Sequence, residues 1–130
     1  MRRFALMLGL SAAVALLGAC SKRTEPRGDP GVCFHVVQLK DGSLKYNKLT
    51  ENVPNMETCA ANLEAMRIKF LRLGGTNAEL LGAYQGTFIF LRKDGIFAAQ
   101  TLEGTAYPAL VRTGDGRLAI PGAMPPHPDN

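Results

Sequence analysis

Few residues of this 130-residue chain have the types and spacing that catalysis requires. Of the two histidines, His127 lies among prolines near the C-terminus, and His35 stands alone inside an apolar run. A lone strand histidine is more often a packed core or rim residue than a catalyst. The acidic residues are scattered rather than paired as glycoside hydrolysis needs, and they fall in expected turns or on an expected helix surface. They include Asp41, Glu57, Glu64, Asp94 and Asp115.

The sequence motifs that assemble catalytic sites are missing as well. The chain has no Gly-x-Ser-x-Gly elbow, no Ser-x-x-Lys, no His-Glu-x-x-His and no phosphate-binding glycine loop. A site needs a nucleophile with its base, a set of metal ligands or a cofactor loop. We therefore expect a protein that is not an enzyme, with no catalytic residue, no metal site and no cofactor.

Cysteine is the remaining reactive side chain, and the first of the three cysteines has a distinctive setting. Cys20 follows an apolar run over residues 4–17, which itself follows Arg2 and Arg3. A positive end, an apolar centre and small residues before a cleavage point are the three parts of an export signal. The apolar run is shorter than the roughly 20 residues that span a bilayer. Residues 1–19 are therefore expected to be a signal peptide.

The run Leu17-Gly18-Ala19-Cys20 resembles the lipobox of bacterial lipoprotein precursors. The resemblance implies cleavage before Cys20 and a lipid on its sulfur, which places the domain in the periplasm on a membrane anchor. Ser21 differs from the aspartate of an inner-membrane retention signal, and this difference favours the outer membrane. Two other interpretations stay open: a retained anchor helix, or a secreted protein cut after Ala19 without lipid.

With Cys20 assigned to lipid, Cys33 and Cys59 remain as one pair. Such a pair is expected to oxidise outside the reducing cytoplasm. The alternative is a redox or metal-binding pair, but the spacing is not C-x-x-C and no other ligands cluster nearby. We predict a structural disulfide, which constrains the unfolded chain by about 3 to 4 kcal/mol.

Net charge gives little support for a polyanionic partner. The chain has 15 Lys and Arg against 11 Asp and Glu. Removing Arg2 and Arg3 with the leader leaves 13 against 11, a balance of +2. The cations form no dense block, so we expect no nucleic-acid partner. Lys22 and Arg23 beside the lipid suit anionic headgroups, at about 1 kcal/mol each.

Composition divides the mature chain into three parts. Residues 20–31 hold the lipidated cysteine and then prolines, glycines and mixed charges, which predict a flexible linker. Residues 32–120 are long enough for a single domain. Residues 121–130 contain four of the chain's eight prolines and are expected to be a disordered tail.

Three Asp-Gly pairs predict hairpins within the domain, because Asp-Gly tolerates the positive φ of tight turns. The strand-like runs around them are 32–39 with 43–49, 81–92 with 96–102, and 107–112 with 117–120. Between the first two hairpins, an apolar stripe with Asn55 as N-cap predicts a helix over 55–73. The expected fold is α+β: an antiparallel sheet in ββαββββ order, about five or six strands, with one helix on one face and a Cys33–Cys59 staple.

One helix covers only one face of such a sheet, yet the alternation of side chains along the strands places large apolar groups on both faces. Period 2 directs Cys33 and His35 toward the helix. The second face is buried by a coiled sheet, is covered by the linker or tail, or docks a partner. Two glycines around Tyr84 and Gln85 mark either a bend or a ligand groove. The candidate interaction surface consists of Phe34, Val36, Tyr84, Gln85, Phe88 and Phe90.

The expected function is that of a membrane-tethered envelope lipoprotein, a non-catalytic structural or protein-interaction module with an envelope protein as partner. An alternative is an inhibitor of a secreted enzyme, or a small-ligand-binding lipoprotein. The run Gly42-Ser43-Leu44-Lys45-Tyr46 resembles the inhibitory loop of envelope lysozyme inhibitors. That resemblance implies a largely all-β fold, which the predicted helix opposes.

Overall fold

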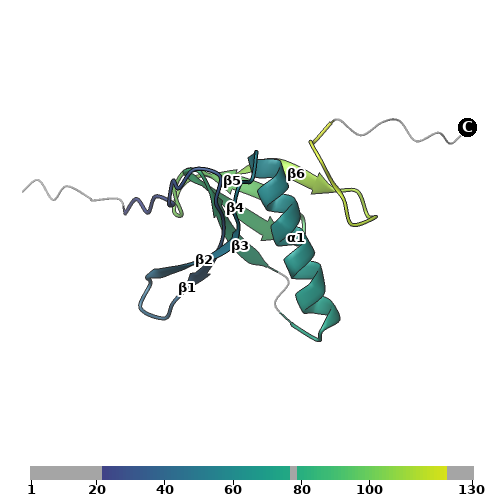
Figure 1. The fold of residues 1–130 in the computed structure, drawn as a ribbon, viewed down its shortest axis with the longest axis horizontal. Helices are drawn as coiled ribbons and strands as arrows, with labels where there is room; N and C mark the ends of the chain where they lie inside the picture. The colour runs from purple at the N-terminus through teal and green to yellow at the C-terminus, as the bar shows by residue number, and fades with distance from the viewer. Residues whose placement is uncertain (1–21, 77–78, 123–130) are drawn as a thin grey trace, which may run out of the picture.

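A computed structural model describes residues 22–76 and 79–122 (Figure 1). Within these ranges the chain forms β1 (Cys33–Gln38), β2 (Leu44–Thr50), α1 (Met56–Arg72), β3 (Leu80–Tyr84), β4 (Thr87–Arg92), β5 (Gly95–Ala99), β6 (Tyr107–Arg112) and β7 (Leu118–Ala119). The strands pair antiparallel in the order β2-β1-β3-β4-β5-β6-β7. The α+β class with one helix is confirmed. The predicted signal peptide, Cys20 and residues 123–130 of the predicted tail lie outside the described residues.

The helix α1 begins and ends where its capping residues predict. The side chain of Asn55 accepts a hydrogen bond from the Thr58 amide at 2.8 Å. Glu57 lies in the first turn and Arg72 in the last, which suits the helix dipole. Gly74, with φ of 91°, takes the left-handed conformation that follows many helices. The buried stripe of α1 consists of Cys59, Ala60, Leu63 and Glu64.

The run 81–92, which we expected to be one strand, is a hairpin. Gln85 and Gly86 have φ of 41° and 82°, and they connect β3 to β4. Positive φ at both central residues is the requirement of a type I′ turn. The sheet therefore has one strand more than expected. The prediction was wrong here because the turn uses Gln-Gly rather than Asp-Gly.

This turn also changes which side chains share a face. Directly paired residues of a hairpin point to the same side, and Ala83 pairs with Phe88 while Tyr84 pairs with Thr87. Tyr84 consequently packs in the helix-side cluster with Cys33 and Ile89. Phe88 packs on the other side. The expectation that Tyr84 shares a face with Phe88 is wrong, because it assumed an uninterrupted strand.

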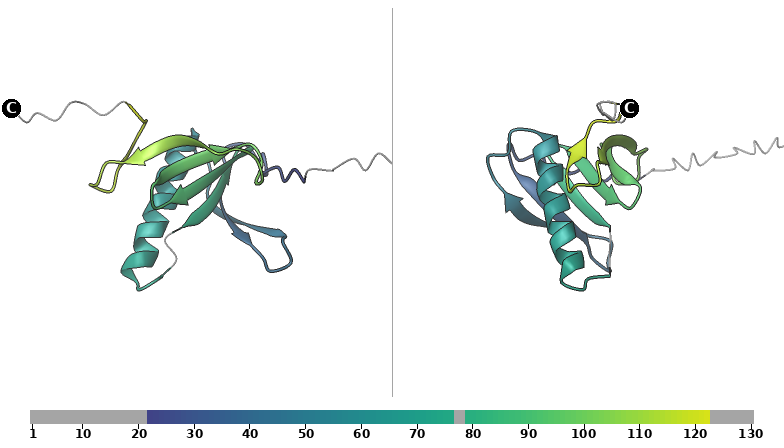
Figure 2. Two further views of the ribbon diagram at one scale, coloured as in Figure 1. Left: turned by 180° about the vertical axis from the view of Figure 1, so that it is seen from behind. Right: turned by 90° about the vertical axis from the view of Figure 1, so that its right-hand side faces the viewer.

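Two hydrophobic clusters lie on opposite faces of the sheet, and α1 covers one of them (Figure 2). Phe34 and Val36 belong to the face away from the helix, as the period-2 pattern predicted. The disulfide between Cys33 and Cys59 is present, with a Cα–Cα distance of 5.4 Å. It joins the first residue of β1 to the first turns of α1 and confirms the predicted staple.

The second face is covered by the chain itself. Tyr46 from β2 stacks edge-on against Phe34 at 5.5 Å between ring centroids. The guanidinium of Arg27 lies over the same Phe34 ring, at 4.9 Å from its centroid. Arg27 belongs to the segment that we expected to be a flexible linker. From Thr24 onward this segment is hydrogen-bonded to the domain, so that expectation is wrong for residues 24–31.

Candidate functional site

The predicted interaction surface is mostly interior. The exposed fractions of Phe34, Val36 and Phe88 are 3%, 3% and 0%, and all three lie in one cluster with Phe90 packed against it. The expectation that they form an open docking face is wrong, because they pack against one another and against side chains that include Leu44, Tyr46 and Leu102. Coverage by the chain itself is the alternative that the structure supports, with Arg27 of the linker and Tyr46 of β2 over the Phe34 ring.

Tyr84 and Gln85 do not form the expected groove. The Tyr84 hydroxyl donates to the Val53 carbonyl at 2.6 Å, and the side chain is 5% exposed. Gln85 is exposed, but its side-chain oxygen accepts the Gly31 amide at 2.8 Å. Both residues therefore position the chain around the β3–β4 turn.

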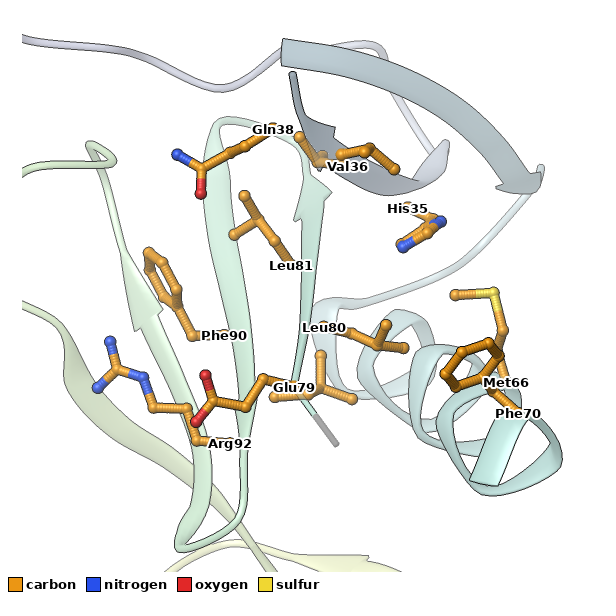
Figure 3. A pocket seen from close by; sticks show the side chains of 12 residues that line it. His35, Val36, Gln38, Met66, Phe70, Glu79, Leu80, Leu81, Phe90 and Arg92 are labelled. Atoms are coloured by element: carbon orange, nitrogen blue, oxygen red, sulfur yellow. The ribbon is translucent and has the colours of Figure 1, made fainter. Parts of the chain in front are cut away.

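A cleft instead lies where β1 and β3 separate. Their ladder ends at the pair Val36–Leu81, although β1 continues to Gln38 and β3 starts earlier, at Leu80. A cavity of about 560 Å³ occupies this fork (Figure 3). It falls within the range of about 300–1,000 Å³ that is typical of ligand sites. Its lining is largely apolar: Val36, Val37, Met66, Phe70, Leu80, Leu81, Phe90 and Leu91, with His35, Gln38, Glu79 and Arg92.

The arrangement of the elements keeps this fork open. The β1–β2 hairpin and the C-terminal half of α1 diverge, as the two opposite views in Figures 1 and 2 show. Met66 and Phe70 reach the space from α1, Leu80 from β3 and His35 from β1 (Figure 3). The Phe70 ring also lies against Gly75, where a Cβ would come within 2.1 Å of it.

His35 and Arg92 are among the polar side chains that line the cleft. Burial lowers the pKa of His35, which favours its neutral form. The guanidinium of Arg92 lies over the Phe90 and Phe97 rings at 5.1 and 5.0 Å from their centroids. In the described ranges, no three His, Cys, Asp or Glu side chains gather as a metal site needs.

Exposed apolar side chains form the rim of the cleft: Phe70 lines it, and Leu39 and Leu73 follow the ends of β1 and α1, two elements that line it. Leu39 follows β1 directly, and Leu73 lies one helical turn beyond Phe70. The exposed fractions of Leu39, Phe70 and Leu73 are 44%, 47% and 78%. They are three of the five exposed large apolar side chains among the described residues. The sequence pattern missed this site, because the site depends on where a strand ladder stops.

No family model, curated protein or solved structure matches the chain. The functional argument therefore rests on the residues and their geometry. Over residues 22–76 and 79–122, no helix combines the length and apolar character needed to cross a membrane.

Proposed function

We propose that this protein is a lipoprotein of the cell envelope that binds an envelope protein, without catalysis, through the cleft between β1 and β3. Lipid on Cys20 anchors it, with the domain in the periplasm and the outer membrane favoured. The lipobox resemblance supports the anchor, and an oxidised Cys33–Cys59 pair suits an exported protein. The observation that carries the binding role is the apolar cleft with its exposed rim.

The rim favours a protein partner over an enclosed small molecule. Small-molecule sites bury most of the ligand's surface, whereas Phe70 and Leu73 stay about half and more than three-quarters exposed beside the cleft. β1 also extends two residues, Val37 and Gln38, past its last pair with β3. An extended partner segment can pair with such a strand end while its apolar side chains enter the cleft.

Crosslinking in intact cells tests this role. A photoreactive amino acid at Leu73 is expected to form an adduct with one discrete envelope protein. Phe70→Asp is expected to abolish the adduct, because a charge on the rim opposes burial of an apolar segment. Ile120→Asp is the matched control, since Ile120 is similarly exposed, at 58%, directly after the strand β7. An adduct that survives Phe70→Asp in a folded protein would refute the cleft as the binding site.

Anchoring has its own test. Mass spectrometry of the mature protein is expected to show a diacylglyceryl group on an N-terminal Cys20. Cys20→Ala is expected to release the domain from membranes if it is still exported. An unmodified Cys20 in the mature protein contradicts the proposed lipid anchor but does not bear on the proposed binding role of the cleft.

Enzyme inhibition remains a second candidate function because of the β1–β2 hairpin. The hairpin extends away from the rest of the domain (Figure 1), and Gly42, Ser43 and Lys45 at its tip are exposed. A projecting loop of this kind is able to enter the active-site groove of an enzyme. Purified domain should then inhibit lysozyme, and Lys45→Glu should weaken the inhibition. Full lysozyme activity at micromolar domain removes this candidate.

A further inference from the structure

Thr24, near the start of the described chain, is hydrogen-bonded to the loop between β5 and β6, almost 80 residues later in the sequence. Its amide donates to Glu103 Oε2 at 2.8 Å, and its hydroxyl donates to Glu103 Oε1 at 2.5 Å. Its carbonyl accepts the Leu102 amide at 2.9 Å. Both the backbone and the side chain of Thr24 are therefore held by the loop between β5 and β6.

The segment after Thr24 is attached at two more places. The Arg27 carbonyl accepts the Gly86 amide at 3.3 Å, and the Gly31 amide donates to Gln85 at 2.8 Å. Both contacts involve the β3–β4 turn. With three separate attachments, the segment 24–31 behaves as part of the fold.

Only three residues separate Cys20 from this attachment. Four Cα–Cα steps span at most about 14 Å, since a fully extended chain advances about 3.3–3.6 Å per residue. A lipid on Cys20 would therefore keep Thr24 within about 14 Å of the lipidated residue. The β3–β4 turn and the β5–β6 loop, which bind this segment, are held near the bilayer with it.

The cleft lies at the other end of the molecule. The α1 helix starts just after Val53, whose amide donates to the Gly31 carbonyl at 2.9 Å, so its N-terminus is at the tethered end. Its 17 residues rise about 25 Å toward Leu73. The turn of the β1–β2 hairpin and the C-terminal end of α1 both lie at that far end (Figure 1). Leu39 lies in this turn, and Phe70 lies near the end of α1.

We propose that the tethered end rests on a bilayer containing anionic phospholipid, so that the domain has a fixed orientation with its cleft facing away from the membrane. This inference rests on the proposed lipidation of Cys20. Lys22 and Arg23 lie in the short tether and are exposed, which places two cations at the anionic headgroups. Tyr107, 53% exposed at the start of β6, lies at the same end and suits the membrane interface.

Fluorescence quenching tests this orientation on the full mature protein. Lipidated protein is reconstituted in vesicles of phosphatidylethanolamine and phosphatidylglycerol that carry nitroxide on some headgroups. Thr105→Cys and Lys40→Cys place a fluorophore at exposed sites of the tethered end and the cleft end. Gln100→Cys supplies a second label position in the tethered-end loop. We expect several-fold stronger quenching at 100 and 105 than at 40.

A tether variant supplies the control, with a long Gly-Ser segment inserted between Arg23 and Thr24. Because the domain itself is unchanged, quenching at 105 is expected to fall toward the value at 40. Equal quenching at all three positions in the parent protein, with Cys20 lipidated by mass spectrometry, overturns the orientation alone. An unlipidated Cys20 overturns the proposed anchor and this inference together.

Discussion

The Glu64 carboxylate accepts a hydrogen bond from Arg112 Nε at 2.7 Å, across 48 residues of sequence. Glu64 is the one buried charged side chain of the described residues, at 3% exposed. Arg67, one turn further along α1, donates to both carboxylate oxygens at 2.7 and 2.9 Å. Arg112 also donates to the Arg92 carbonyl at 2.5 Å. The cluster therefore ties α1 to β6 and to the β4–β5 turn.

Glu64→Ala is expected to lower the free energy of unfolding by about 3–5 kcal/mol, because it removes the carboxylate that balances the charge of two partly buried guanidinium groups. Urea denaturation measures this loss. Glu57→Ala is the control, an exposed acid on the same helix, and is expected to cost only tenths of a kcal/mol. Equal stability of the two variants would contradict a structural role for the cluster.

Acid is expected to weaken the fold through the same residue. Burial disfavours the charge of Glu64, but hydrogen bonds from Arg67 and Arg112 outweigh it, so its pKa is lowered from 4.5. The unfolded state therefore takes up the proton first as the pH falls. The contribution of Glu64 to stability is present above about pH 4.5 and is lost as the pH falls through the lowered folded pKa. Stability of Glu64→Gln should depend less on pH over this acidic window.

The disulfide is expected to contribute about 3 to 4 kcal/mol, since it closes a long loop in the unfolded chain. The double variant Cys33→Ser/Cys59→Ser should lose this amount in urea denaturation. Reductant should lower the stability of the parent domain and leave the double variant unchanged. An effect of reductant on the double variant would show that another thiol takes part.

Gly82 is expected to tolerate no side chain, because α1 packs directly on it. A Cβ at this position would lie 2.2 Å from Leu63 Cδ1 and 3.1 Å from the Phe34 carbonyl oxygen. Gly82→Ala should cost about 1–3 kcal/mol through overpacking. Gly28→Ala is the matched control, because nothing lies within 4 Å of its Cβ position. If Leu63 is the obstacle, Gly82→Ala/Leu63→Val should lose less than the sum of the single losses.

Local signals predicted most of the secondary structure. Asn55 as an N-cap and the apolar stripe located α1, and Asp-Gly pairs located three hairpins. Gly82 and Gly86, the two glycines around Tyr84 and Gln85, were expected to mark a bend or a ligand groove, but the two glycines have different structural roles. Gly86 completes a hairpin turn, and Gly82 admits a neighbouring helix. The turn at Gly86 is a local feature, since Gln85 and Gly86 are neighbours in the sequence. The need for glycine at position 82 comes from Leu63, which is distant in the sequence.

The candidate site was harder to predict, because burial depends on segments that are distant in sequence. Phe34 is apolar and alternates correctly, yet whether it is exposed depends on Arg27 and Tyr46. A polar segment with prolines and glycines looks flexible in isolation. It becomes ordered because Glu103, Leu102 and Gly86 supply hydrogen-bond partners.

The sequence alone determined the helix, most of the strand pairs and the cysteine pair, because each depends on near neighbours or on a simple count. The leader with its lipobox resemblance stays a prediction from the sequence. The tertiary structure decided three things: that both sheet faces are covered, that the ladder between β1 and β3 stops at Val36–Leu81, and that Thr24 is bound to the domain. Each depends on contacts between residues far apart in the chain, which hydrophobic periodicity does not encode.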